Sequence, residues 1–199
     1  MLHVRSGYPG RAALLIGLVA IVAADVAPLD HRFSVHMAQH LVLGDLGPLC
    51  VVVGLRGRLR LAHPAVALPL WAASLVVWHL SGPYDAALRH VWLHQLQHLC
   101  FAAAGLAVWS AVLLEGPRWF TLVRRLPYVL VLWLVPLALS QVFIWSSHPF
   151  YRGYSLSDQR AGGGVMLVEG SVVMICVIVW LLLRILREAE AKQRLLEAG

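Results

Sequence analysis

Long apolar blocks separated by short polar connections dominate the chain. Six of them approach the roughly 20 residues that cross the hydrocarbon core of a bilayer. They lie at residues 11–28, 34–54, 64–81, 91–114, 127–147 and 162–184. Apolar residues fill these blocks instead of forming one stripe, which is typical of membrane-spanning helices. The pattern predicts an all-α, polytopic membrane helix bundle of about six transmembrane helices, in a single transmembrane domain over residues 1–199.

The two ends of this pattern differ in character. The first block is short and carries Asp25 near its end, and no small-residue cleavage site follows it. We therefore expect a retained first helix and not a removed signal peptide. Residues 185–199 are rich in charge and alanine, which predicts a short, helical, solvated tail in the cytoplasm.

Composition supports a membrane protein and excludes some other classes. The chain is 60% hydrophobic and 13% charged, whereas soluble domains are about 45–50% apolar. Its net charge of +6 does not indicate nucleic-acid binding, because the arginines flank apolar blocks, where they anchor helices to anionic lipid. Cys50, Cys100 and Cys176 are far apart inside apolar blocks, so we expect small buried side chains and not a thiolate site.

Basic residues alternate along the connections and thereby predict the topology. Twelve of the 16 lie before the first block, in the second and fourth connections, and after the last block. These are Arg5, Arg11, Arg56, Arg58, Arg60, Arg118, Arg124, Arg125, Arg184, Arg187, Lys192 and Arg194. Positively charged loops stay in the cytoplasm, so both termini are predicted to be cytoplasmic, in a bacterial inner (plasma) membrane.

Histidines gather at the opposite ends of the blocks. Eight of the ten lie in the outer connections or at the outer block ends, namely His31, His36, His40, His79, His90, His94, His98 and His148. A lone histidine at such a place is usually an interfacial side chain, and we interpret His31, His90 and His148 in this way.

Two histidine pairs share the pattern His-x-x-Gln-His, at His36–His40 and His94–His98. Residues four apart lie on one face of a helix, so each pair directs two imidazoles the same way. Both blocks enter the membrane from the outer side, which places the pairs at one depth, and His79 ends the third block there. Imidazole is the commonest side-chain metal ligand. We therefore predict a metal site formed by His36, His40, His79, His94 and His98.

Other polar side chains near these pairs are candidates for supporting roles. Gln39 and Gln97 are expected to hydrogen-bond the second ring nitrogen of a histidine or another helix. Asp45 is nine residues beyond His36, about 180° around an α-helix, so it is expected to meet another helix. Candidates for additional ligands are Met37, Asp158, Met166 and Glu169, and Asp158 could instead cap the last helix. Imidazoles with methionine and few carboxylates favour copper.

Four ordered motifs resemble the CtaG family of membrane-bound assembly factors for haem–copper cytochrome c oxidase. They are Ser34-x-His36-Met37-x-Gln39-His40, Trp78-His79-x-x-x-Pro83-Tyr84-Asp85-x-x-x-x-His90, His94-x-x-Gln97-His98 and Asp158-Gln159-x-x-Gly162-Gly163. The resemblance covers about residues 28–184. It implies a multi-span helical protein that helps copper reach the buried oxidase centre, with the five histidines named above handling the metal.

Some positions depart from the family pattern. The chain has six blocks where fuller members have seven, and Asp45 occupies a stretch that is usually apolar and rich in methionine. Leu167 replaces a usual tryptophan and Glu169 stands where proline is common. The histidine motifs are intact, whereas the number of metal ions and any methionine ligand are left open.

The predicted function is that of an assembly factor, not an enzyme, which binds copper and helps deliver it to the catalytic subunit of cytochrome c oxidase. Membrane lipid is a further partner, nucleic acid is not, and a homo-oligomer is compatible with the sequence. One alternative is a redox protein that holds haem b between histidines of the second and fourth blocks. Another is a proton-coupled transporter using Asp45 and Glu169, which would leave the histidines unexplained.

Overall fold

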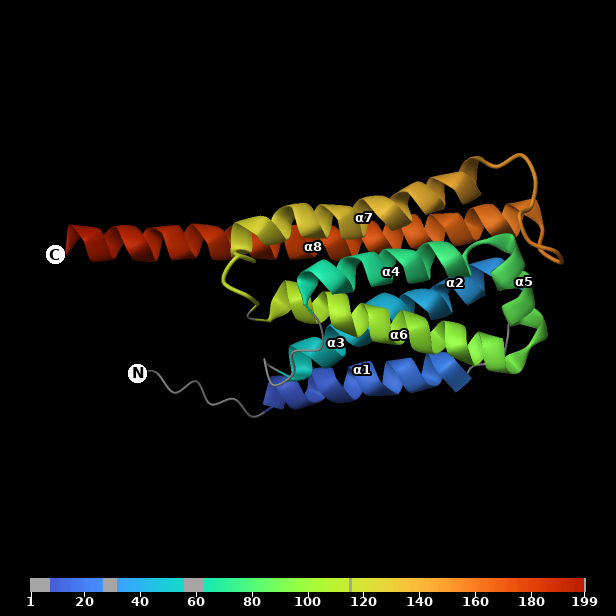
Figure 1. Ribbon diagram of the computed structural model, residues 1–199, viewed down its shortest axis with the longest axis horizontal. Helices are drawn as coiled ribbons and strands as arrows, with labels where there is room; N and C mark the ends of the chain where they lie inside the picture. The colour runs from blue at the N-terminus through green and yellow to red at the C-terminus, as the bar shows by residue number, and fades with distance from the viewer. Residues whose placement is uncertain (1–7, 27–31, 56–62, 115, 199) are drawn as a thin grey trace.

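Helices carry the greater part of each apolar block of the sequence (Figure 1). The computed structural model describes residues 8–26, 32–55, 63–114 and 116–198, and within these ranges it contains no strand. The elements are α1 (Tyr8–Val26), α2 (Phe33–Leu41), the π-helix η1 (Val42–Leu46), α3 (Gly47–Leu55), α4 (Pro64–Trp78), α5 (Ser81–Arg89), α6 (Val91–Leu113), α7 (Leu122–Trp145) and α8 (Leu156–Glu197). The predicted all-α fold class is confirmed.

Four helical stretches of the described chain are long and apolar enough to cross a membrane. They are Phe33–Leu55, Val91–Leu113, Leu122–Trp145 and Leu156–Glu197. Helices α4 and α5, bent by 72° at a short break, form a fifth if they count as one span. Helix α1 covers the first expected block but is not among these stretches. The predicted number of six spans is therefore approximate.

A π-helical turn interrupts the second span at Val42–Leu46, between α2 and α3. Pro48 follows it, and proline both lacks an N–H donor and crowds the carbonyl group four residues earlier, here that of Gly44. A wider turn relieves this crowding and changes the angle between residues before and after it. The residues of η1 therefore face directions that an uninterrupted α-helix would not give them.

Helices α2, α3 and α6 lie at the centre of the bundle. Helix α6 packs against η1, α3 and α4, while α1 lies along α3, and α8 lies along α7 and α2. At the crossing of α6 with η1, a Cβ atom added to Gly105 would lie 2.2 Å from the carbonyl oxygen of Gly44. Glycine at this position lets the two helices that carry the histidine pairs approach closely.

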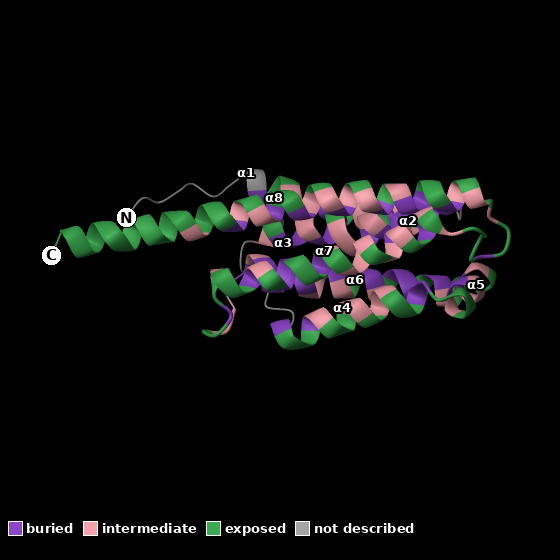
Figure 2. Cartoon of the chain, turned by 90° about the horizontal axis from the view of Figure 1, so that it is seen from above, coloured by how far each residue is buried: buried purple, intermediate pink, exposed green. Residues whose placement is uncertain are grey.

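Buried side chains line the interior of the bundle, and exposed ones cover its outside and the end of α8 (Figure 2). The start of α1, the α6–α7 connection and the extended end of α8 lie at one end of the bundle (Figure 1). The starts of α2, α6 and α8 lie at the other end. Arg5, Arg56, Arg58, Arg60, His3 and His31 are outside the described residues.

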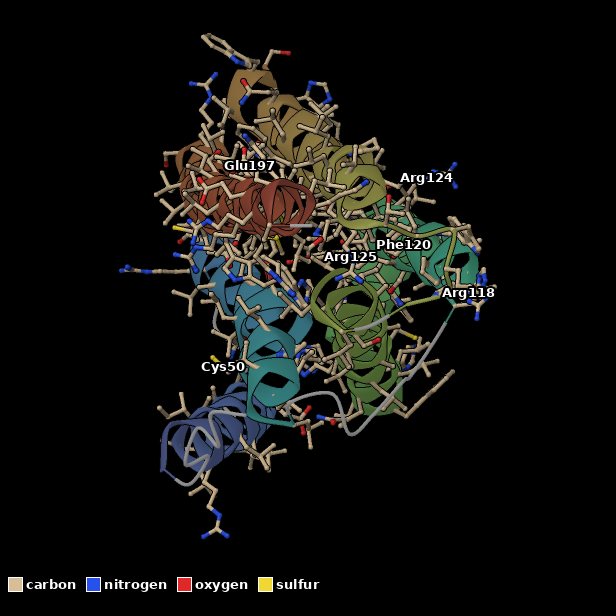
Figure 3. The ribbon with its side chains drawn as sticks, turned by 90° about the vertical axis from the view of Figure 1, so that its left-hand side faces the viewer. Cys50, Arg118, Phe120, Arg124, Arg125 and Glu197 are labelled. Carbon is tan, nitrogen blue, oxygen red and sulfur yellow. The ribbon has the colours of Figure 1, made fainter. Side chains whose placement is uncertain are left out.

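Arg125 has a role that its place in a basic connection did not predict. It is only 6% exposed, and its guanidinium group donates to the carbonyl oxygens of Val112 and Leu114, both at 2.7 Å. It thereby satisfies free carbonyl groups at the end of α6. Figure 3, which looks onto this end of the bundle, shows Arg125 turned inward while Arg118 and Arg124 point away.

Candidate metal centre

The two histidine pairs lie on adjacent helices, as the spacing suggested. His36 and His40 on α2 have ring centroids 4.3 Å apart, and His94 and His98 on α6 are 4.0 Å apart. Between the helices, the centroids of His36 and His94 are separated by 5.4 Å, and those of His40 and His98 by 5.7 Å. Four imidazoles thus form two facing pairs.

His79 joins this arrangement from the break between α4 and α5. Its ring centroid is 5.9 Å from that of His40. Its Nδ1 lies 2.7 Å from the carbonyl oxygen of Leu75, one turn back in α4. If Nδ1 carries the proton and donates it there, the lone pair of Nε2 is free to bind a metal. We call these five residues (His36, His40, His79, His94 and His98) the histidine group.

Every member of the histidine group is buried, with exposed fractions between 0% and 8%. Seven of its buried ring nitrogens have no hydrogen-bond partner: both in His36, both in His40, and Nε2 of His79, His94 and His98. A buried polar atom without a partner costs free energy. Such a concentration of unpaired ring nitrogens fits residues whose natural partner is a metal ion.

Asp25 at the end of α1 supports this interpretation. Its Oδ1 lies 3.0 Å from Nδ1 of His98. Metal-bound histidines commonly pair the other ring nitrogen with a carboxylate, which fixes the tautomer and strengthens the ligand. The sequence holds one signal of this role, because Asp25 lies near the end of the first block, at the same depth as the histidine pairs.

The two glutamines do not have the role considered for them. No hydrogen bond joins Gln39 or Gln97 to an imidazole, and both amide atoms of Gln97 are buried without a partner. Asp25 and the Leu75 carbonyl oxygen instead contact the Nδ1 atoms of His98 and His79.

Asp158 lies at the start of α2 and not among the imidazoles. Its carboxylate accepts hydrogen bonds from the backbone N–H groups of Phe33 and Ser34, at 2.5 and 3.2 Å, and from the Ser34 hydroxyl at 2.6 Å. An acid at this place satisfies free N–H groups and complements the helix dipole. Asp158 therefore ties the first turn of α8 to the helix that presents His36 and His40.

Aromatic side chains pack beside the histidine group. Phe33, Tyr84, Phe143 and Tyr151 form a buried cluster in which Tyr84 stacks on Tyr151 at 3.9 Å and contacts the ring of His36 at 5.3 Å. The Tyr151 hydroxyl donates to the carbonyl oxygen of His79 at 2.7 Å. Burial raises the pKa of Tyr151, so it remains a neutral donor.

The remaining candidates border a cavity of about 70 Å³ next to the histidine group. Met37, Met166 and Glu169 line it together with His40 and His79. Asp45 lines it too, and its Oδ1 accepts a hydrogen bond from the Trp109 indole at 2.8 Å. Asp45 thus meets another helix, as expected. It also shares a cavity with His40, because η1 changes the angle that an uninterrupted α-helix would give.

What could this arrangement do? As the side chains stand, no three histidine, cysteine, aspartate or glutamate residues of the described chain form a ready metal site. The rings must therefore rotate before several nitrogens can bind one ion. The arrangement is thus a buried group of five candidate imidazole ligands in a bundle of helices that are long and apolar enough to cross a membrane.

That class of protein agrees with the comparison with known families. The family model of the cytochrome c oxidase caa3 assembly factor (Caa3_CtaG) matches residues 8–188. The chain belongs to this family, which confirms the resemblance found in the sequence motifs.

Three mycobacterial proteins are similar to the chain, and all are called uncharacterized. Mb0105 of Mycobacterium bovis and MT0111 of Mycobacterium tuberculosis are each 27% identical over 73% of this chain. ML1998 of Mycobacterium leprae is 25% identical over 85% of it. The matched region spans 29% of the first two relatives and 33% of the third, so the chain covers about a third of their length. No solved structure matches the chain.

Proposed function

We propose that this protein is a cytochrome c oxidase assembly factor that binds copper in the histidine group and passes it to the copper centre of the oxidase catalytic subunit. The proposal includes no catalysis by the chain itself. Family membership supports the link to the oxidase. The copper part rests on one observation: seven buried imidazole nitrogens, on five neighbouring histidines, have no hydrogen-bond partner.

Ligand chemistry favours copper over other metals. Imidazole suits copper, zinc, iron and nickel, whereas magnesium and calcium prefer oxygen ligands. Thioethers select Cu(I), and Met37 lines the cavity that His40 and His79 also border. The three cysteines are free and lie outside the histidine group, so no thiolate competes for the ion.

Haem binding is the alternative, and the ring distances disfavour it. Facing histidines of α2 and α6 are 5.4 and 5.7 Å apart between centroids, which is within the usual contact range of aromatic pairs. No porphyrin fits between rings that already touch. The cavity that His40 and His79 line, about 70 Å³, is also far smaller than the ~300–1,000 Å³ of typical ligand sites.

Metal analysis and absorbance of the purified protein test the proposal. Protein from cells grown with copper is expected to contain copper and to show no Soret band. Removing the metal with a chelator and adding Cu(II) should restore the copper content, because the proposed site exchanges its ion. A Soret band with a sharp α-band after reduction would instead support the haem alternative and contradict the proposal.

We also propose that the histidine group faces the outer side of the membrane, with both termini in the cytoplasm. The charge asymmetry of the sequence supports this orientation. Arg118 and Arg124 lie at the end of the bundle from which α8 extends (Figure 3).

Labelling of introduced cysteines tests this orientation. In a variant whose natural cysteines are replaced by alanine, Ser81→Cys is expected to react with an impermeant maleimide added outside intact cells. Ala191→Cys is the matched control on the α8 tail and should react only after permeabilisation. Both positions are exposed in the structure. The reverse pattern would overturn the proposed orientation and the location of the histidine group.

A further inference from the structure

The methionines of this chain are few and are placed together. The sequence has four, and Met1 lies outside the described residues. The other three are Met37 on α2 and Met166 and Met174 on α8. All three are buried, with exposed fractions of 1%, 5% and 4%, and all three line the same cavity. The other buried residues of the core cluster that contains Met174 are leucine, valine, alanine and aromatic residues.

This cavity continues from the histidine group toward the middle of the bundle. His40 and His79 line its wall, and both are more than nine-tenths buried. Both ring nitrogens of His40 and Nε2 of His79 lack a partner. Asp45 lies five residues beyond His40, within η1. His36, His94 and His98 do not border the cavity.

The charge of the cavity suits a cation. Asp45 from η1 and Glu169 from α8 both line the cavity. The two Glu169 oxygens are buried and accept no hydrogen bond from an N–H or hydroxyl group. Arginine and lysine are absent from the described residues that line the cavity. Acidic side chains within a membrane span are costly and are kept where they meet a cation or a proton.

We propose that this cavity is a second metal site, which takes Cu(I) with thioether ligands from Met37, Met166 and Met174. Soft thioethers with imidazole select Cu(I) over Cu(II) and over divalent ions that prefer oxygen. A carboxylate of Asp45 or Glu169, once ionised beside the ion, would offset part of the cost of placing it inside the membrane. A volume of about 70 Å³ suffices for one ion without its hydration shell.

The second site rests on the proposed copper function, and it adds a path by which the ion could leave the histidine group. His40 and His79 belong both to the histidine group and to the cavity wall. An ion could therefore pass from one site to the other by exchanging imidazole ligands for thioethers.

X-ray absorption of selenomethionine-labelled protein loaded anaerobically with Cu(I) tests the second site directly. Wild-type protein is expected to bind one Cu(I) with nitrogen neighbours and one with selenium neighbours. The His36→Ala/His94→Ala variant alters only the histidine group and should keep the ion with selenium neighbours. The Met166→Leu/Met174→Leu variant should lose that ion, because leucine preserves the volume but removes the thioethers.

Three controls make the result specific. Leu132→Ile changes the cavity wall without changing sulfur, and should keep the selenium signal. Met1 remains in the double methionine variant, so a signal arising from Met1 would persist there. Glu169→Gln should weaken Cu(I) binding in the cavity about tenfold, whereas Glu188→Gln on the exposed tail of α8 should not.

Two results would overturn the second site: no copper–selenium scattering in wild-type protein, or unchanged Cu(I) stoichiometry in the double methionine variant. Failure of the histidine group looks different, because the nitrogen-bound ion is then missing while the selenium-bound ion remains.

Discussion

Replacing His40 and His98 together by alanine is expected to abolish stoichiometric Cu(II) binding to the purified protein. The two residues come from α2 and α6, and their rings face each other at 5.7 Å. Their loss removes one imidazole from each pair and leaves at most three members of the histidine group. Cu(II) is the appropriate probe, because imidazole binds it well whereas thioethers select Cu(I). Titration followed by electron paramagnetic resonance measures the loss.

The same variant should also affect the oxidase in cells. We expect an oxidase that contains haem but lacks its buried copper, and consequently reduces little oxygen. His90→Ala/His148→Ala is the matched control, because both of these histidines are exposed and lie outside the histidine group. Full copper binding and full oxidase activity in the His40/His98 variant would show that both the site and the function proposed here are wrong.

Replacing Gly105 by alanine adds one methyl group at the crossing of α6 with η1. This change is expected to lower both the stability of the protein and its copper binding. In Gly105→Ala the new Cβ would lie 2.2 Å from the Gly44 carbonyl oxygen and 2.9 Å from Pro48 Cγ. Backbone atoms cannot rotate away, so the helices must separate. Overpacking of this kind costs about 1–3 kcal/mol. The two histidine pairs should also move apart, which weakens copper binding.

Thermal unfolding in detergent, together with copper titration, measures both consequences. The matched control is Gly164→Ala on α8, where an added Cβ meets no atom within 4 Å. Alanine is favoured over glycine in a helix by about 0.5–1 kcal/mol, so this control should unfold at an equal or higher temperature. If Gly105→Ala unfolds at the same temperature as Gly164→Ala and binds copper equally well, the close crossing does not hold the two pairs together.

The arrangement of the histidines could be predicted because two independent regularities of the sequence describe it. Helical spacing places His36 with His40 and His94 with His98 on single faces. Charge asymmetry places both pairs at one depth. Neither regularity depends on knowing how the helices pack. This is why the facing pairs could be expected without a structure.

Other features depended on packing, which an apolar helix does not reveal. A helix that is apolar on all sides has no face that identifies its neighbour. The depth of Asp25 on α1 therefore did not identify His98 on α6 as its partner. The direction of Asp45 was calculated for an uninterrupted α-helix, and η1 changes it. Arg125 was interpreted as a membrane anchor, whereas it binds the carbonyl groups that end α6.

Helix α8 is longer than the hydrocarbon core of a membrane is thick. Its 42 residues extend about 63 Å at 1.5 Å per residue, roughly twice the ~30 Å hydrocarbon thickness. Within the part of the chain that the structure describes, no helix lies beside the last turns, and local pairs such as Arg184 with Glu188 and Arg194 with Glu190 support them. Such pairs weaken as salt screens them. The helix–coil equilibrium of this rod should therefore shift with ionic strength, while the part of α8 that carries Asp158 and Glu169 stays folded within the bundle.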